Sequence, residues 1–110
     1  MAFPGAETAL VPREKLVEYL LNADHPAGAA KASWFNSLGY DREAAELLAE
    51  DLVAVANSDQ DYEVDETAWG TKFIARGLVG RTPGRRAVVI TVWITLSEAP
   101  PRLVTAYPAD

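Results

Sequence analysis

Two β-rich stretches decide the fold: "WGTKFIARGLVG" at residues 69–80 and "RAVVITVWITLS" at residues 86–97. β-branched and aromatic residues dominate both stretches, and "RTPGR" between them contains a Pro-Gly pair that is typical of a turn. The pattern therefore predicts an antiparallel hairpin. A short strand, "RLVTAYP" at residues 102–108, follows the Pro100-Pro101 break, and a short extended piece is expected at residues 62–64.

The part of the chain before this hairpin has the periodicity of helices. Apolar residues recur at helical spacing in three segments, at about 13–22, 26–38 and 42–57. Pro26 suits the first turn of the second segment, Gly39 ends it, and Asp41 is a good N-cap for the third.

Because helices come first and strands follow, the sequence predicts an α+β fold. We expect N-terminal helices packed on one face of a C-terminal antiparallel sheet of three to four strands. A chain of 110 residues is long enough for one core, so a single domain is expected over residues 1–110. Its parts would be an N-terminal arm (1–12), a helical part (13–57) and a sheet part (62–108).

Composition excludes several classes of function. The chain has no cysteine, so disulfide frameworks and thiolate metal sites are excluded. The alternating acids of residues 59–65 lack the glycine of a calcium loop and indicate a solvated loop, so no metal and no cofactor is expected. No apolar run approaches the roughly 20 residues that cross a bilayer, and no secretory signal is visible. We therefore expect a cytoplasmic protein without a membrane partner.

Charge is unevenly distributed along the chain. The net charge is −6, which argues against nucleic-acid binding through a broadly basic surface. Residues 43–66 contain acids and no Lys or Arg, whereas residues 72–86 contain bases and no acid. A locally basic sheet within an acidic protein therefore remains open.

Alternation along the second long strand predicts two different faces. The aliphatic side chains of residues 88, 90, 92, 94 and 96 are expected to face the helices, which would leave Thr91, Trp93 and Thr95 on the outer face. On the preceding strand Phe73 is expected inward and Lys72 and Arg76 outward. The outer face then offers a binding surface, or is simply the solvated side of a sheet. Its candidate substrate-binding residues are Lys72, Arg76, Trp93, Arg102 and Tyr107.

His25 is the only histidine and stands directly before Pro26. An imidazole titrates near neutral pH, so His25 could be a general base or acid, or it could cap the helix that follows. Lys31 does not share a helix face with position 25. The two could converge only because His25 lies off the helix end, and Lys31 could equally be a solvated lysine.

The remaining chemical inventory is one histidine, a few cations and hydroxyl groups on a sheet. It suits metal-independent RNA cleavage by attack of a 2′-hydroxyl on its own phosphodiester. In that reaction a base takes the hydroxyl proton, cations stabilise the phosphorane and an acid protonates the leaving oxygen.

Two parts of the sequence carry a resemblance to a known family. The His-Pro-x-Gly-x-x-Lys-Ala core at residues 25–32 and the segment at residues 102–108 resemble a bacterial family of small domains of unknown function. Its members occur alone and at the ends of polymorphic-toxin and filamentous-haemagglutinin-type proteins. The resemblance covers roughly residues 13–108.

The order of helices and sheet also resembles the barnase–EndoU–colicin–RelE group of metal-independent ribonucleases. That resemblance implies His25 as the proton-transfer residue, Lys31 as the phosphate or transition-state cation and Thr105 as a phosphate ligand. It gives Arg102 and Lys72 supporting roles. Some members use two histidines where this chain has one, so the second acid–base partner is unassigned.

Two functions follow from these observations. One is a toxin-like ribonuclease whose partner is RNA. The other is a non-catalytic immunity or antitoxin-type module, whose acidic surface binds a cognate toxin protein. Charge complementarity favours the second, and the His25–Lys31 pairing and the toxin context favour the first.

Overall fold

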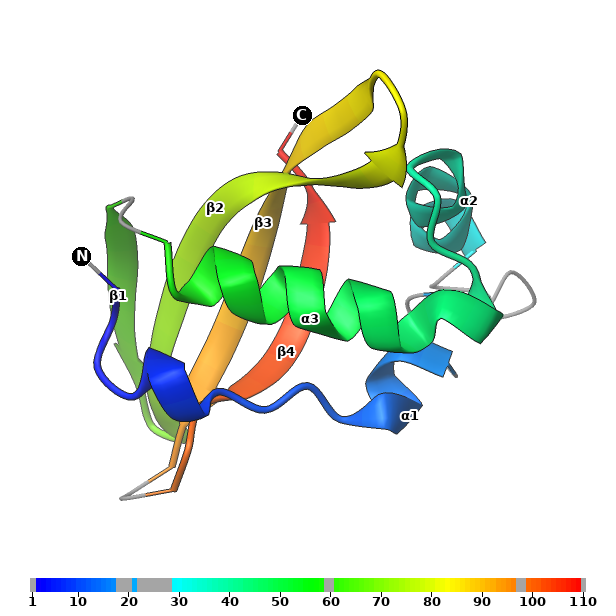
Figure 1. Ribbon diagram of the computed structural model, residues 1–110. Coiled ribbons are helices and arrows are strands. Elements are labelled where there is room, and N and C mark those ends of the chain that lie inside the picture. The colour runs from blue at the N-terminus through cyan, green and yellow to red at the C-terminus, as the bar shows by residue number, and fades with distance from the viewer. Residues whose placement is uncertain (1, 18–20, 22–28, 59–60, 97–98, 110) are drawn as a thin grey trace.

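The computed structural model describes residues 2–17, 21, 29–58, 61–96 and 99–109 (Figure 1). Short helices come first and a sheet follows, which confirms the predicted α+β fold. The helical elements are η1 (Ala6–Thr8), α1 (Arg13–Lys15), α2 (Ala29–Ser37), η3 (Arg42–Ala44) and α3 (Ala45–Ala56). The strands are β1 (Tyr62–Thr67), β2 (Gly70–Thr82), β3 (Arg85–Thr95) and β4 (Arg102–Pro108).

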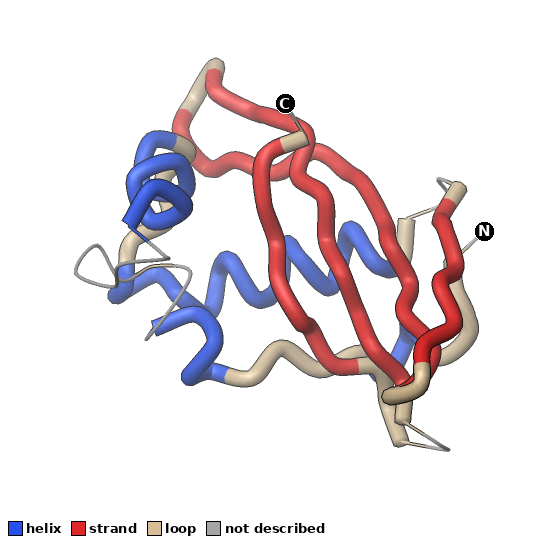
Figure 2. Tube along the Cα trace, turned by 180° about the vertical axis from the view of Figure 1, so that it is seen from behind, coloured by secondary structure: helices blue, strands red, loops and turns tan. Residues whose placement is uncertain are grey.

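The four strands form one antiparallel sheet in the order β1-β2-β3-β4. The predicted hairpin of β2 and β3 is confirmed, and Thr82 pairs with Arg85 around the Pro83-Gly84 turn. β1 runs beyond the short extended piece that was expected. Helix α3 crosses one face of the sheet (Figure 1), and the opposite face is seen from behind in Figure 2 without a described helix over it.

The end of α2 and both ends of the third predicted helix, formed by η3 and α3, lie about where the sequence predicts. The Asp41 carboxylate accepts a hydrogen bond from the Ala44 amide at 2.8 Å, which caps η3 and leads the chain into α3. Gly39, with a φ of +100°, ends α2. The apolar stripe of α3 is buried as expected, through Ala45, Leu48, Leu52, Val55 and Ala56. Parts of the first two predicted helices, at residues 18–20, 22 and 26–28, lie outside the described residues.

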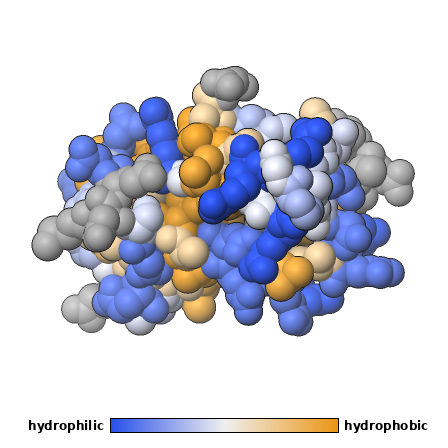
Figure 3. All heavy atoms as spheres, turned by 45° about the horizontal axis from the view of Figure 1, so that its top comes forward, coloured by the Kyte–Doolittle hydropathy of each residue, from blue (hydrophilic) through white to orange (hydrophobic). Residues whose placement is uncertain are grey.

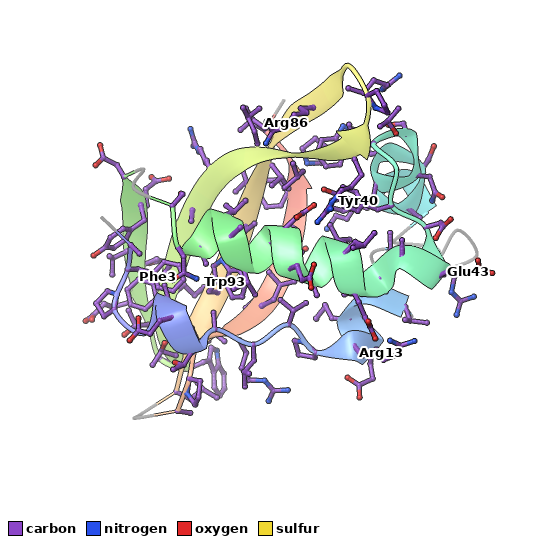
Figure 4. All side chains as sticks on the ribbon, viewed as in Figure 1. Phe3, Arg13, Tyr40, Glu43, Arg86 and Trp93 are labelled. Carbon is purple, nitrogen blue, oxygen red and sulfur yellow. The ribbon has the colours of Figure 1, made fainter. Side chains whose placement is uncertain are left out.

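Aromatic side chains fill the core between α3 and the sheet. Phe3 stacks on Phe73 with ring centroids 4.7 Å apart, and its centroid lies 6.2 Å from that of Trp93 (Figure 4). The predicted N-terminal arm is therefore part of the core, because its Phe3 closes the aromatic cluster from the helical side.

The predicted orientation of β3 is wrong. Trp93 and Thr91 are fully buried on the helix-covered face, whereas Val88 is 41% exposed on the other face. The Trp93 Nε1 donates to Thr91 Oγ1, and Thr91 Oγ1 donates to the Ala75 carbonyl, both at 2.8 Å. This chain of hydrogen bonds satisfies the polar atoms that burial removes from water.

A β-bulge at Gly80 explains the error. The turn pairs Thr82 with Arg85, a register that would place Phe73 opposite Ile94 and make the aliphatic side of β3 face the core. The register shifts by one residue between Val79 and Thr82, so that Phe73 instead pairs with Trp93. A shift of one residue exchanges the two faces of a strand. Gly80 permits it with a φ of +150°, a conformation that L side chains rarely adopt.

We call the uncovered side of the sheet the open face. By register it carries Lys72, Ile74, Arg76 and Leu78 of β2, Val88, Ile90, Val92 and Ile94 of β3, and Arg102, Thr105 and Tyr107 of β4. The prediction that Phe73 faces inward and that Lys72 and Arg76 face outward is confirmed.

Candidate functional site

Two of the candidate residues meet at the edge of the sheet, where α2 lies beside β4. The Lys31 Nζ donates a hydrogen bond to Thr105 Oγ1 at 2.9 Å, across 74 residues of sequence. Both residues are half-buried, so the ammonium group and the hydroxyl group are held by the fold yet remain within reach of solvent.

A second β-bulge brings Thr105 to this position. Trp93 pairs with Leu103 but Val92 pairs with Thr105, so Val104 is the extra residue in β4. The bulge places Thr105 on the open face, together with Arg102 and Tyr107.

Strict alternation along β4 would place Leu103 on the same side as Thr105, but the two lie on opposite faces. Leu103 is 3% exposed and belongs to the core, because the bulge shifts the alternation by one residue between Leu103 and Thr105.

Cations dominate the surroundings of this hydrogen bond. The Lys31 Nζ lies 5.9 Å from the ring centroid of Tyr107, a distance typical of a cation–π contact. An open pocket of about 1000 Å³ adjoins the site and has three cationic side chains and one carboxylate at its wall. Its lining residues are Pro12, Glu14, Lys15, Lys31, Ile94, Leu96, Arg102, Leu103, Val104 and Thr105. The excess of positive charge favours an anionic ligand such as a phosphate.

The other predicted residues are placed differently. Lys72 and Arg76 lie on the open face but on β2, two strands and therefore about 10 Å from β4. Arg76 is 3.8 Å from the Glu63 carboxylate. Trp93 is buried in the core and offers no surface for a ligand, so its expected place on the outer face is corrected. His25 lies outside the described residues.

Sequence reasoning missed a polar network beyond the C-terminal end of α2. The Tyr40 hydroxyl donates to the Asp51 carboxylate at 2.5 Å and accepts from the Gly80 amide at 2.9 Å. The Arg81 guanidinium makes two hydrogen bonds to the same carboxylate, at 2.8 and 2.9 Å. The network fastens the segment between α2 and α3, where Tyr40 lies (labelled in Figure 4), to the bulge of β2. No spacing in the sequence signals it, because its hydrogen bonds join residues 11, 30 and 40 positions apart on different elements.

The network shifts two pKa values. Burial raises the pKa of Tyr40 to about 12, and the hydrogen bond to the Asp51 carboxylate adds to the shift. Burial alone would raise the pKa of Asp51, but the hydrogen bonds from Arg81 and Tyr40 outweigh it, so the pKa is lowered. With these shifts the Tyr40 phenol stays protonated and the Asp51 carboxyl stays ionised, so the hydrogen bond between them is kept.

Within residues 2–17, 21, 29–58, 61–96 and 99–109, no group of three or more His, Asp or Glu side chains is placed to hold a metal ion. None of the helices described in these ranges has the length and apolar character required to cross a membrane.

The fold and the site define a small α+β domain with a lysine–threonine pair and a cationic pocket at the edge of its sheet. The chain belongs to the family described as domain of unknown function DUF6883, whose model matches residues 2–110. No curated protein matches it.

A solved structure contains a chain of similar fold. It is the contact-dependent growth inhibition toxin–immunity protein complex from Klebsiella pneumoniae 342. The two chains superpose with a TM-score of 0.72 and 16% identity, over 89% of this chain and 97% of that chain. At this level of identity the similarity shows a shared fold.

Proposed function

We propose that this domain is a toxin-like, metal-independent ribonuclease that acts in the cytoplasm. The observation that carries the proposal is the hydrogen bond between Lys31 and Thr105. The sequence resemblance selected these residues as the cation and the hydroxyl group of a phosphate site, and the fold brings them to 2.9 Å from each other.

The geometry of this pair suits phosphate binding. Thr105 Oγ1 accepts a hydrogen bond from the Lys31 ammonium, so the hydroxyl proton is directed elsewhere and can be donated to a phosphate oxygen. The ammonium lies beside the same oxygen-binding position and would stabilise the negative charge that builds up on the phosphorane. Arg102 adds a third donor group from the pocket wall.

The reaction is a transesterification. A base removes the proton of the 2′-hydroxyl, the 2′-oxygen forms a bond to phosphorus, and the bond from phosphorus to the 5′-oxygen breaks. The leaving 5′-oxygen takes up a proton, which gives a 2′,3′-cyclic phosphate and a 5′-hydroxyl end. We assign proton transfer to His25 on the sequence, and binding of the flanking RNA to Lys72, Arg76 and Tyr107 on the open face.

The test is RNA cleavage in excess chelator. Wild-type protein should produce fragments with 2′,3′-cyclic phosphate ends, and Lys31→Ala or Thr105→Ala should slow cleavage by about 10²-fold or more. His25→Ala should abolish it. Arg42→Ala removes an exposed cation from η3 that does not line the pocket, and this variant should cleave like the wild type. Intact RNA after incubation with folded wild-type protein would refute the proposal, as would cleavage that survives all three site variants.

A second candidate function is an immunity-type module that binds a toxin protein. It is favoured by the exposed acidic strand β1, whose Glu63, Asp65 and Glu66 side chains face solvent. The chain of similar fold also comes from a toxin–immunity complex. This candidate predicts that RNA stays intact and that the chain binds a basic bacterial ribonuclease in surface plasmon resonance. The double variant Glu63→Lys/Asp65→Lys should lose that binding. Unchanged binding by the double variant would exclude β1 as the interface.

A further inference from the structure

Trp69 is the most exposed large apolar side chain in the described part of the chain. It is 81% exposed, and the next in order, Val64, is 54% exposed. It stands in the two-residue turn Ala68-Trp69 that joins β1 to β2, at the lower end of the sheet in Figure 1. Such turns favour Asn, Asp and Gly, and the ring packs in no core. Neither the turn nor the core therefore uses this indole, and it is available to a partner.

Hydrogen bonds and close packing fix the turn on which Trp69 stands. Thr67 Oγ1 accepts a hydrogen bond from the Trp69 amide at 3.1 Å and donates one to the Gly70 carbonyl at 2.8 Å. Gly70 has a φ of +147° and lies so close to β3 that a Cβ there would be 2.5 Å from the Thr95 carbonyl oxygen. A side chain on a pre-organised turn loses less conformational freedom when it binds, which favours affinity.

The apolar surface at this turn is small and centred on one ring. The Leu96 side chain borders Gly70 and is 47% exposed, so Trp69 and Leu96 lie on either side of this glycine. Figure 3 brings the upper end of the molecule forward, and there hydrophobic residues form a strip between hydrophilic regions. A single exposed indole fits a concave socket, as aromatic hot-spot residues do when they fill pockets of a partner protein.

Carboxylates dominate the strand that leads into the turn. Four exposed acids precede it, Asp61, Glu63, Asp65 and Glu66. Two cations of β2 face three of them: Arg76 lies 3.8 Å from Glu63 and lines a pocket with Asp61, and Lys72 pairs in register with Asp65. The residue opposite Glu66 is Thr71, which carries no charge. Four carboxylates against two cations leave this end of the hairpin negative.

We infer that the β1–β2 turn is a docking site for a protein with an apolar socket bordered by Lys or Arg side chains. Trp69 would enter the socket, and Asp65 and Glu66 would contact its basic border. Nucleic acid and anionic lipid fit less well, because the same carboxylates would repel their phosphate groups.

This docking site is separate from the Lys31–Thr105 pair. β1 and β4 are the two outer strands of the sheet, and Thr105 lies on β4. The inference goes beyond both candidate functions, because it rests on the turn itself and requires no RNA cleavage.

The experiment begins with site-specific photo-cross-linking. The full chain carries p-benzoylphenylalanine at position 69 and is expressed in the cells that encode it. A control chain carries the same group in place of Leu47, an apolar residue that is 39% exposed on α3. Mass spectrometry should identify a protein that cross-links from position 69 and not from position 47, at a site next to Lys or Arg residues.

Calorimetry with this purified protein then measures the contribution of each feature. Trp69→Ala should weaken binding by about 30-fold or more, the effect of a hot-spot residue, whereas Leu47→Ala should bind like the wild type. Thr67→Val keeps the ring but removes the two hydrogen bonds, and should weaken binding by about three- to tenfold. Asp65→Lys/Glu66→Lys should weaken it at least about tenfold, and less so in high salt. Circular dichroism confirms that each variant is folded.

Several outcomes would overturn the inference. Absence of a protein that cross-links from position 69 alone would do so, as would equal binding of the wild type and Trp69→Ala. Tighter binding by Asp65→Lys/Glu66→Lys would contradict a basic socket. Cross-links to a second copy of the chain would assign the turn to self-association. Binding of an RNA oligonucleotide or of phosphatidylglycerol vesicles that depends on Trp69 would assign it to that ligand.

The two proposals fail independently. RNA cleavage is measured with the Lys31 and Thr105 variants, and Trp69→Ala should leave it unchanged. Loss of the ribonuclease proposal therefore leaves the binding test of Trp69 intact.

Discussion

The two faces of the sheet are built from different side chains and are expected to contribute differently to stability. The covered face is aromatic and hydrogen-bonded: Trp93 and Phe73 pack beneath Phe3, and Thr91 joins Trp93 to the main chain of β2. The open face is aliphatic, and Leu78 and Val88 remain exposed. Stability should therefore depend on the covered face and on Ile90, which is buried although it lies on the open face, while the exposed positions Leu78 and Val88 can change with little effect on folding.

The largest effect is expected for Trp93→Ala. The substitution removes a fully buried aromatic side chain and should lower the free energy of unfolding by about 3–5 kcal/mol. Urea denaturation followed by fluorescence or circular dichroism measures this loss. Leu78→Ala on the open face is the control, and a loss of similar size for both would show that the two faces contribute equally.

Thr91→Val tests the buried hydrogen bonds directly. Valine has nearly the shape of threonine but leaves the Trp93 indole N–H and the Ala75 carbonyl without this hydroxyl, at a cost of about 1–3 kcal/mol. Thr95→Val is a matched control on the same strand, because the buried Thr95 Oγ1 has no hydrogen-bond partner in the described part of the chain. Thr95→Val should be neutral or stabilising. Equal destabilisation by both substitutions would rule out the hydrogen bonds as the cause.

Tyr40→Phe tests the network that holds the covered side to the bulge of β2. Losing the hydrogen bonds to Asp51 and Gly80 should cost about 1–2 kcal/mol at neutral pH. The pKa of Tyr40 is raised to about 12, so its contribution is complete below pH 10 and is lost as the pH rises from 10 towards 12. Unfolding measured across this range should show the gap between wild type and Tyr40→Phe closing. A constant gap would contradict the assigned pKa.

The same network has an acid limit. The pKa of Asp51 is lowered in the folded state, so its contribution is present above the unfolded value of 3.8 and declines as the pH falls through the folded value. Asp51→Asn should therefore flatten the acid side of the stability profile. A profile identical to the wild type would show that other carboxylates control acid unfolding.

The smallest effect is expected for Val88→Thr. This residue is 41% exposed on the open face, and the substitution should change the free energy of unfolding by no more than about 0.5 kcal/mol. The neighbouring Val89→Thr makes the same chemical change in the core and should be clearly more destabilising, since it buries a hydroxyl group. Similar values for the two adjacent positions would remove the distinction between the faces.

The positions of the helices and strands could be predicted from the sequence, but which side of β3 faces the core could not. Periodicity placed α3, the β2–β3 hairpin and β4, because each has a regular pattern and a clear turn or break. The alternation along β3 was correct in itself, yet its aliphatic side was assigned to the core. One unpaired residue near Gly80 reverses that assignment, and a glycine in a strand does not by itself reveal how the register continues.

The candidate site was predictable only in part. The resemblance pointed to Lys31 and Thr105, which the fold brings together. The bulge at Val104, which places Arg102 and Tyr107 on the same face as Thr105, has no signal in composition or spacing. The Tyr40 network likewise depends on which strand ends beside which helix, and this is decided by the packing of the whole domain.

The position of Thr105 in β4 also has a consequence for synthesis of the chain. Lys31 leaves the ribosome early, whereas β4 follows every other described element and emerges last. Until β4 pairs with β3, the lysine has no hydroxyl group beside it and the pocket lacks Arg102, Leu103 and Val104 from its wall. A nascent chain would therefore carry no assembled Lys31–Thr105 pair until β4 has been translated and has paired with β3.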